Sequence, residues 1–310
     1  MDYLKFIEEQ SASLQSTVGD QLAINALSGG VDSSVVTALG HKALGSKLKT
    51  VLVDNSLMRE NEPQRVAAEF KAMGIPVEVV DARDEFLSAL KGVTDPEEKR
   101  HAITNTFYKT VFGKIVRDSG AKFLLHGTIL TDIEETLAGI KRQHNILSQL
   151  GIDPSEAYGY AVLEPLATLR KDGVREVARL LGLPANMTSR IPFPGPALAT
   201  RIIGEVTPER LATVRAATEI VEGELESTKA FQYLAVLLND RATGIRDGQR
   251  EFGQMIAVRC IDSTDARTAT VTEIPWSTLH RISQRITAIP GVNRCLYDLT
   301  PKPPATVEYI

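Results

Sequence analysis

The stretch SGGVDSS, residues 28–34, combines residue types that bind phosphate with one that repels it. Glycines let backbone N–H groups approach oxygen atoms closely, and serine hydroxyls add further donors. A helix expected directly behind the loop adds the positive end of its dipole. No lysine closes the loop, as it does in the G-x-x-x-x-G-K-[ST] pattern, so neutral donors would hold the phosphates. The loop therefore predicts a site for a pyrophosphate group.

The carboxylate of this loop, Asp32, needs a separate explanation because phosphate oxygens repel it. An acid at a helix N-terminus is common, since the helix dipole favours it. Within the complete seven-residue string, a magnesium ion between Asp32 and the phosphates explains the residue better. The metal reverses the local charge logic and makes the carboxylate a ligand.

Short apolar runs alternate with helical repeats through the first half of the chain. Strands are expected at residues 23–27, 48–53, 76–80 and 122–125, and helices at 4–16, 32–44, 62–73 and 97–119. This alternation predicts an α/β fold, a parallel sheet with helices on both faces. Such sheets bind ligands at the carboxyl ends of their strands. Residues 28–34, 54–59 and 126–132 all follow expected strands, so we expect them to form one site.

The character of the sequence changes at residues 189–204, SRIPFPGPALATRIIG. Three prolines and two glycines in this stretch exclude regular structure over most of it. We place a domain boundary here, between residues 1–190 and residues 191–310. The sequence after this boundary predicts a small α+β domain. Helices are expected at residues 208–226 and 276–286, and strands at 255–260, 268–271 and 295–299.

Composition excludes several classes of protein. The 310 residues carry a net charge of −4, which does not favour a protein that grips long nucleic acid. The two cysteines, Cys260 and Cys295, are too few for a disulfide scaffold and too far apart for a thiolate cluster. The acidic N-terminus does not have the form of a signal peptide, and no run approaches the ~18 apolar residues of a membrane span. We expect a cytoplasmic protein without a membrane partner.

The sequence resembles the N-type ATP pyrophosphatases, whose signature is the loop SGGVDSS. These enzymes cleave ATP between its α- and β-phosphates and adenylate a carbonyl oxygen. The resemblance extends over essentially the whole chain. It is carried by the motifs VLVDNSLMR, HGTILTD, LEPLATLRKDGVREVARLLGLP, PFPGPALATRIIGEV and KPPATVEYI. Together they are similar to the ATP-pyrophosphatase and dimerisation parts of GMP synthases. The resemblance implies an adenine nucleotide alpha hydrolase-like fold followed by a dimerisation domain.

The resemblance also implies roles for individual residues. The residues expected to bind ATP are Ser28, Gly29, Gly30, Asp32, Ser33, Ser34, Val53 and Gly127. Asp32 and Asp132 would hold Mg²⁺, and Lys171 would face the phosphates, so these three are the expected catalytic residues. The residues expected to bind the acceptor nucleotide are Lys141, His144, Asn145, Arg201, Lys302 and Glu308. The first three lie on a lid over about residues 134–160, expected to be mobile without ligand.

The implied reaction converts XMP to GMP. Transfer of AMP to the purine carbonyl oxygen creates a leaving group that ammonia displaces, with release of pyrophosphate and AMP. Positioning and charge neutralisation would supply most of the catalysis. The phosphate loop begins at Ser28, which leaves no room for a glutaminase domain, so ammonia is expected from a separate glutaminase subunit or from solution. A homodimer is also implied.

Departures from the family pattern keep two alternatives open. Gln143 stands where a histidine is usual, ILSQLGIDPSEAYGYA replaces the following lid sequence, and Ala197 replaces a glycine. One alternative is a paralogue that activates another acceptor, such as GMP for thiolation with sulfur from a partner. The other is a nucleotide-binding module without turnover. The aromatic residues Phe193, Trp276 and Tyr297 are expected to be packing residues and not base-stacking platforms.

Overall fold

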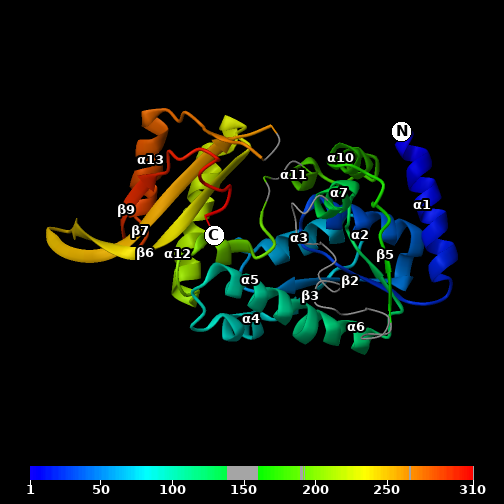
Figure 1. Ribbon diagram of the computed structural model, residues 1–310. Coiled ribbons are helices and arrows are strands. Elements are labelled where there is room, and N and C mark those ends of the chain that lie inside the picture. The colour runs from blue at the N-terminus through cyan, green and yellow to red at the C-terminus, as the bar shows by residue number, and fades with distance from the viewer. Residues whose placement is uncertain (138–159, 189–190, 192, 265–266, 310) are drawn as a thin grey trace. The chain divides into compact units, whose positions relative to one another are not determined.

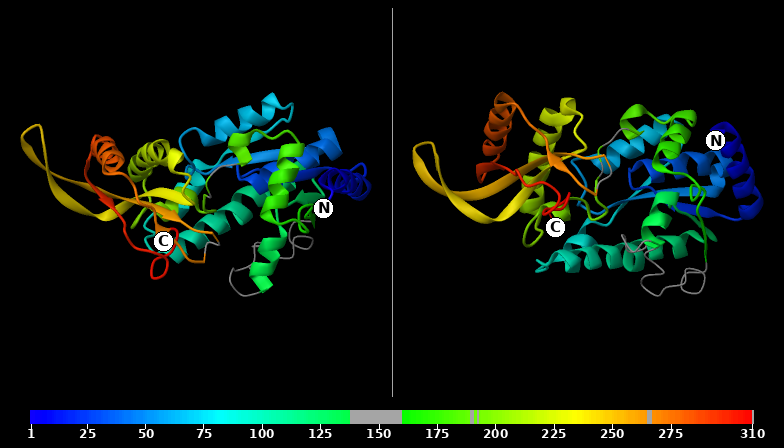
Figure 2. Two further views of the ribbon diagram at one scale, coloured as in Figure 1. Left: turned by 90° about the horizontal axis from the view of Figure 1, so that it is seen from above. Right: turned by 45° about the horizontal axis from the view of Figure 1, so that its top comes forward.

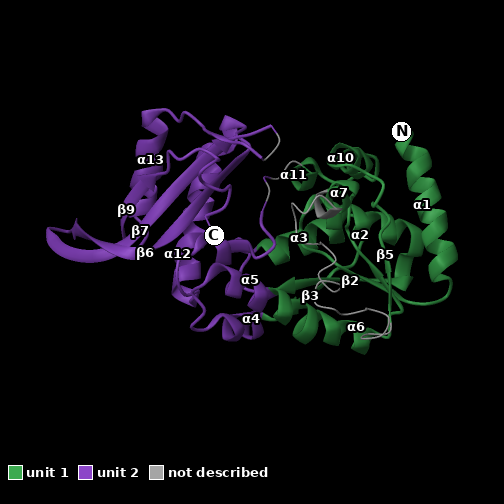
Figure 3. Cartoon of the chain, in the orientation of Figure 1, with its two compact units in different colours: residues 1–54, 62–82, 104–190 green, residues 55–61, 83–103, 191–310 purple. Residues whose placement is uncertain are grey.

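The computed structural model describes residues 1–137, 160–188, 191, 193–264 and 267–309 (Figure 1). The chain divides into two compact units (Figure 3). Unit 1 contains residues 1–54, 62–82 and 104–190, and unit 2 contains residues 55–61, 83–103 and 191–310. Unit 2 thus takes two segments from the first half of the chain. Continuous domains with a single boundary after residue 190 stay a prediction.

Within the described part of unit 1, five strands form a parallel sheet in the order β3-β2-β1-β4-β5. The strands are β1 (Ala23–Ala26), β2 (Leu48–Asp54), β3 (Glu78–Asp81), β4 (Phe123–Leu125) and β5 (Ala161–Leu163). The helices are α1 (Tyr3–Val18), α2 (Val31–Leu44), α3 (Glu62–Ala72), α6 (Gly113–Ser119), α7 (Leu130–Leu137), α10 (Lys171–Leu180) and α11 (Ala185–Thr188).

Helices cover both faces of this sheet, as alternation along β1 shows. Ile24 packs into a buried cluster with Phe112 and Val116, the latter from α6. The next residue, Asn25, points to the other face and donates a hydrogen bond to the Thr37 hydroxyl of α2, at 2.7 Å. Figure 2 shows helices on both sides of these strands. The predicted α/β fold is confirmed.

Helix α2 lies directly on the sheet because Gly40 allows it. A Cβ atom at Gly40 would lie 2.7 Å from Leu125 Cδ2 and 2.8 Å from Leu48 Cδ2, closer than real contacts allow. The glycine therefore sets the distance between helix and sheet. Because α2 begins at Val31, within the phosphate loop (residues 28–34), the same contact holds the loop against the carboxyl end of β1.

Sequence periodicity predicts one helix over residues 97–119, and the structure shows three segments there. Helix α5 (Pro96–Asn105) passes into a π-helical segment (Thr106–Phe112), which leads into α6. The apolar repeat at steps of four is present throughout, but the wider π turn interrupts the regular hydrogen bonding. Helices α4 (Arg83–Leu90), α7 and α10 and strand β5 were not predicted.

Unit 2 is built on a mixed sheet. Strands β6 (Gln232–Arg246) and β7 (Gln249–Asp262) form a long antiparallel hairpin, the curved ribbon of Figures 1 and 2. On its other edge β7 pairs with β8 (Thr270–Val271) antiparallel and with β9 (Val292–Tyr297) parallel. Helices α12 (Pro208–Leu225) and α13 (Trp276–Thr287) pack with this sheet. The predicted α+β character is confirmed, although β6 was missed.

One prediction about packing is wrong. Trp276, at the start of α13, is 77% exposed in this chain and is not a core residue. Tyr297 is half-buried, and its hydroxyl donates to the Thr272 carbonyl oxygen at 2.6 Å. Among the described residues, no helix combines the length and apolar character needed to cross a membrane.

Candidate active site

The phosphate loop, residues 28–34, follows β1 at the carboxyl end of a central strand and continues into the first turn of α2. Gly29 has a φ of +80°, a conformation that side chains with a Cβ rarely adopt. The Ser28 and Ser33 hydroxyl oxygens are 2.9 Å apart, and Ser33 Oγ donates to the Gly30 carbonyl oxygen at 3.0 Å. The Ser28 backbone N–H donates to Ser33 Oγ at 3.2 Å. The loop therefore holds its own shape through hydroxyl groups.

Ser34 is the buried member of the loop. It is 1% exposed, and its Oγ has no hydrogen-bond partner among the described residues. A buried hydroxyl without a partner is unfavourable by about 1–3 kcal/mol. The loop thus contains an unused donor in the first turn of α2, where backbone N–H groups also favour an anion.

The end of β4 lies against this loop. A Cβ atom at Gly127 would lie 3.4 Å from the Asp32 carbonyl carbon and from the Ser33 nitrogen. Beside it, the His126 Nδ1 and Thr128 Oγ1 atoms are 2.9 Å apart, and Thr128 Oγ1 donates to Glu164 Oε1 at 2.5 Å. The structure thus brings together two of the three expected segments. In the third, residues 54–59, Asp54 belongs to unit 1 and residues 55–59 belong to unit 2.

Lys171 reaches the phosphate loop from the start of α10. Its Nζ lies 2.9 Å from Asp32 Oδ1 and 2.7 Å from Asp32 Oδ2. The Lys171 and Asp32 side chains are 44% and 27% exposed. Partly exposed pairs of this kind contribute about 0–1 kcal/mol, so an incoming ligand can rearrange this one at little cost.

The segment before Lys171 is anchored in unit 1. The Leu130 backbone N–H donates to the Leu169 carbonyl oxygen at 2.8 Å, which ties the start of α7 to the start of α10. Lys171 and Asp32 are 139 residues apart in the sequence. Their pairing is a tertiary contact that no local pattern predicts.

The other expected residues of this site have structural roles in the chain as it stands. Asp132 is the third residue of α7, and its Oδ2 accepts a hydrogen bond from the Ile129 backbone N–H at 3.2 Å. Val53 lies near the end of β2, is 8% exposed and is paired with Val80. Their roles toward ATP and metal stay predictions.

The donor set suits magnesium only in combination with phosphate. In the part of the chain that the structure describes, no group of three or more His, Cys, Asp and Glu residues could hold a metal ion. Mg²⁺ bound with nucleotides commonly uses one or two carboxylates and takes its other ligands from phosphates and water. The partly exposed Asp32 carboxylate, in the first turn of α2, meets that requirement.

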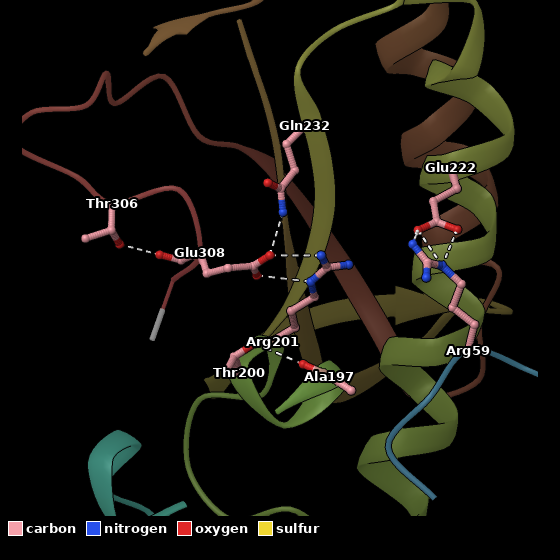
Figure 4. A network of polar contacts seen from close by, with 8 residues as sticks. All are labelled: Arg59, Ala197, Thr200, Arg201, Glu222, Gln232, Thr306 and Glu308. Atoms are coloured by element: carbon pink, nitrogen blue, oxygen red, sulfur yellow. Dashed lines mark hydrogen bonds and ion pairs between the residues drawn. The ribbon is translucent and has the colours of Figure 1, made fainter. Parts of the chain in front are cut away.

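A second polar network lies in unit 2 and is shown in Figure 4. Arg201, on a short 3₁₀ helix (Ala197–Arg201), is fully buried. Its Nε and Nη2 donate to Glu308 Oε2 and Oε1 at 3.1 and 3.0 Å, and Gln232 Nε2 donates to Glu308 Oε1 at 2.6 Å. The Arg201 Nη1 is buried and has no partner among the described residues, and it points away from Glu308 (Figure 4).

Phe193 packs against two guanidinium groups of this network. The Arg59 Cζ lies 3.9 Å and the Arg201 Cζ 4.6 Å from the centre of its ring. Glu222 on α12 fixes Arg59, whose Nε lies 2.8 Å from both of its carboxylate oxygens. The expected packing role of Phe193 agrees with these contacts. Sequence reasoning missed Gln232, Arg59 and Glu222, although Arg59 ends the quoted motif VLVDNSLMR.

Two cations, buried Lys99 and half-buried Arg210, hold the segment that follows Arg201. Lys99 on α5 is 2% exposed and donates to the Ile202 carbonyl oxygen at 2.7 Å. Arg210 donates to the Ile203 carbonyl oxygen at 2.7 Å. Burial and the positive charge of Arg210 lower the pKa of Lys99 to about 8. The backbone around Arg201 is therefore fixed by residues that take no part in the Glu308 network.

The remaining expected acceptor residues divide into two groups. Lys302 is half-buried, and its backbone exchanges two hydrogen bonds of 2.9 Å with Ala269. Lys141, His144 and Asn145, together with Gln143 and most of the expected lid, lie outside the described residues. The residues expected to bind ATP thus lie in unit 1, and Arg201 and Glu308, expected at the acceptor, are paired in unit 2.

Comparisons with known proteins agree with both halves. Residues 5–109 match the NAD synthase family, and residues 219–309 match the family described as GMP synthase C terminal domain. A subunit of the glutamine-hydrolyzing GMP synthase of Archaeoglobus fulgidus is 49% identical over 100% of both chains. The corresponding subunit of Methanocella arvoryzae is also 49% identical, over 100% of this chain and 99% of its own, and that of Methanopyrus kandleri is 46% identical over 99% of each. The chain therefore belongs to the family of these GMP synthase subunits.

Proposed function

We propose that this chain is a ligase that activates XMP with ATP and thereby enables its amination to GMP. The contact of Lys171 with Asp32 of the pyrophosphate loop carries the proposal. The match to the GMP synthase relatives over the whole length of the chain supports it. The oxygen at the reacting purine carbon is a poor leaving group. Adenylation of that oxygen releases pyrophosphate, and ammonia then attacks the carbon and expels AMP.

The residues of unit 1 would bind the β- and γ-phosphates as they leave. Backbone N–H groups and the hydroxyls of Ser28, Ser33 and Ser34 would surround them. Asp32 would hold Mg²⁺, which when bound neutralises charge on the phosphate oxygens. The Lys171 ammonium would move from Asp32 to the phosphates, since the ion pair opens at little cost. Val53 and Gly127 would border the nucleotide.

Residues of unit 2 would bind the acceptor nucleotide. The unpaired Arg201 Nη1 is a buried donor suited to a phosphate or carbonyl oxygen. Glu308, fixed by Arg201 and Gln232, is an acceptor for purine N–H groups, and Lys302 is a cation for the nucleotide phosphate. Lys141, His144 and Asn145 would complete this site from the lid.

Ammonia would come from a separate glutaminase subunit. The relatives are named as one subunit of a glutamine-hydrolyzing GMP synthase, and the chain spans their full length. We also propose that the chain forms a homodimer through unit 2. Gel filtration with light scattering at micromolar concentration tests this, and a monomeric mass would contradict it.

The decisive experiment measures AMP, pyrophosphate and GMP after incubation of the protein with ATP, Mg²⁺, XMP and ammonium. All three products are expected with XMP, and none with Asp32→Asn. A panel with GMP and sulfide, IMP, or no acceptor tests the alternatives. AMP release with GMP and sulfide but not with XMP would favour the thiolating paralogue. ATP binding without pyrophosphate release under any acceptor would favour a module without turnover.

A further inference from the structure

Arg259 is a buried arginine at the centre of unit 2, outside every motif discussed above. It lies on β7 and is 0% exposed. Its Nη1 donates to Asp298 Oδ2 at 2.8 Å and to the Thr300 carbonyl oxygen at 2.7 Å. Its Nη2 donates to the Thr306 carbonyl oxygen at 2.9 Å. A single guanidinium therefore holds two points of the C-terminal tail that are six residues apart.

These two points lie on either side of Lys302. Thr300 precedes it, and Thr306 follows it and donates its own hydroxyl to the Glu308 carbonyl oxygen. The backbone of Lys302 itself exchanges a pair of hydrogen bonds with Ala269. Arg259 thus controls the spacing between the lysine and the carboxylate that the proposed function assigns to the acceptor.

We propose that Arg259 is the positioning residue of the acceptor site. It does not contact the acceptor nucleotide. Its guanidinium fixes residues 300–306 so that Lys302 and Glu308 are already arranged when the nucleotide arrives. The link to acceptor binding rests on the proposed function, whereas the hold on the tail rests on the contacts alone.

The chemistry of the site requires arginine. Three acceptors surround the side chain in different directions, and a planar guanidinium meets them with fixed donors, whereas a lysine ammonium reaches fewer. Burial raises the pKa of Asp298, but hydrogen bonds from Thr300 and the charge of Arg259 more than offset this and keep it below its ordinary value. The pair is therefore charged at neutral pH. The order that it gives the tail reduces the ordering that acceptor binding would otherwise require.

The test compares Arg259→Lys with a matched control, Arg246→Lys. Arg246 is also in unit 2, pairs with Glu251 and donates to two backbone carbonyl oxygens, those of Thr287 and Val292, but it does not touch the tail. We expect Arg259→Lys to raise the KM for XMP about 10- to 100-fold, the range for loss of a hydrogen bond to a charged group. The KM for ATP should stay at the wild-type value. Arg246→Lys should leave both KM values unchanged.

A second readout does not depend on activity. Hydrogen exchange followed by mass spectrometry should show faster exchange in the peptide covering residues 299–309 of Arg259→Lys, with unit 1 unchanged. Asp298→Asn, which removes the charged partner, should show the same pattern more weakly, and it decides the matter if Arg259→Lys does not fold. Wild-type exchange in the tail, or equal changes in Arg246→Lys, would overturn the proposal. A different result would contradict the proposed function and leave the hold on the tail intact. In that case Arg259→Lys shows faster tail exchange, but the wild-type protein itself shows no XMP-dependent reaction.

Discussion

The phosphate loop of unit 1 and the Arg201 network of unit 2 are held together by different means. The loop is stabilised by neutral hydroxyl and backbone hydrogen bonds, and the ion pair between Lys171 and Asp32 is partly exposed. In the network, the Arg201–Glu308 pair has side chains that are 0% and 16% exposed. The first pair can exchange partners with water or ligand, whereas the second cannot lose one without leaving a buried charge.

The two regions therefore hold their polar side chains in different states before a ligand binds. Unit 1 keeps a cation and a carboxylate that are paired with each other until a ligand competes for both. The Arg201 network of unit 2 keeps its carboxylate fixed, while the Arg201 Nη1 is a buried donor without a partner among the described residues. Substitutions in unit 1 should therefore affect turnover more than stability, and substitutions in the network should affect both.

The largest effect on stability is expected when the buried Arg201–Glu308 pair is broken. Glu308→Gln should lower the free energy of unfolding by about 3–5 kcal/mol, because it leaves the Arg201 charge buried and uncompensated. The control is Glu251→Gln, whose partner Arg246 is 38% exposed, and it should cost no more than about 1 kcal/mol. Urea unfolding followed by circular dichroism measures both. Equal losses in the two variants would remove the distinction.

Lys171→Met tests the opposite property of the exposed pair. We expect acceptor-dependent pyrophosphate release to fall about 10²- to 10³-fold, as for removal of a group that stabilises transition-state charge. The free energy of unfolding should change by less than about 1 kcal/mol. Arg179→Met on the same helix, where the paired side chains are 67% and 37% exposed, is the control and should keep wild-type turnover. A loss of stability that matches the loss of turnover would contradict the comparison.

The buried Lys99 of unit 2 should make the stability of the protein depend on pH. Its pKa is about 8 in the folded chain and 10.5 ordinarily, so between these values the unfolded chain binds a proton that the folded chain has released. Stability should therefore rise with pH in this window, by at most about 1.4 kcal/mol per pH unit. Lys99→Met removes this rise. The difference in unfolding free energy between the wild-type protein and Lys99→Met should change steadily from pH 7.5 to 10. A constant difference would show that the pKa of Lys99 is not lowered in the folded chain.

The smallest expected effect concerns the contact between β4 and the loop. Gly127→Ala places a methyl group in ordinary van der Waals contact with two backbone atoms of the loop, at 3.4 Å, so the fold should tolerate it. The methyl group would take space beside the bound nucleotide, which should weaken ATP binding by about 1 kcal/mol. We expect the KM for ATP to rise about fivefold and the KM for XMP to stay constant. Gly223→Ala, where no atom lies within 4 Å of an added Cβ, is the matched control. An unchanged KM for ATP would place the nucleotide away from Gly127.

The regular part of unit 1 was predictable because local signals determine it. Strand β1 and helix α2 differ from the predicted ranges by one residue at an end, since a short apolar run and a glycine-rich turn define them. Strand β6 was missed although it is long, because a continuous apolar run such as that at residues 234–238 does not by itself separate strand from helix.

The candidate site was predictable only in part, for a related reason. The motifs identified Asp32, Lys171, Arg201 and Glu308 separately, whereas their pairing depends on how distant segments pack. Gln232 lies in the missed strand and carries no motif, and its role became visible only beside Glu308. Trp276 was expected inside because aromatic residues usually pack, and its exposure reflects a position that the sequence pattern of α13 does not reveal.

The division of the chain into two units has a consequence for anyone who wishes to separate them. Unit 2 is discontinuous: Arg59, which pairs with Glu222, and Lys99, which holds Ile202, come from segments that precede residue 104. A fragment starting at residue 191 would lack both anchors and would leave Glu222 without Arg59. Residues 191–310 are therefore not expected to fold as an independent domain. Chimeras between relatives should exchange residues 55–61 and 83–103 together with residues 191–310.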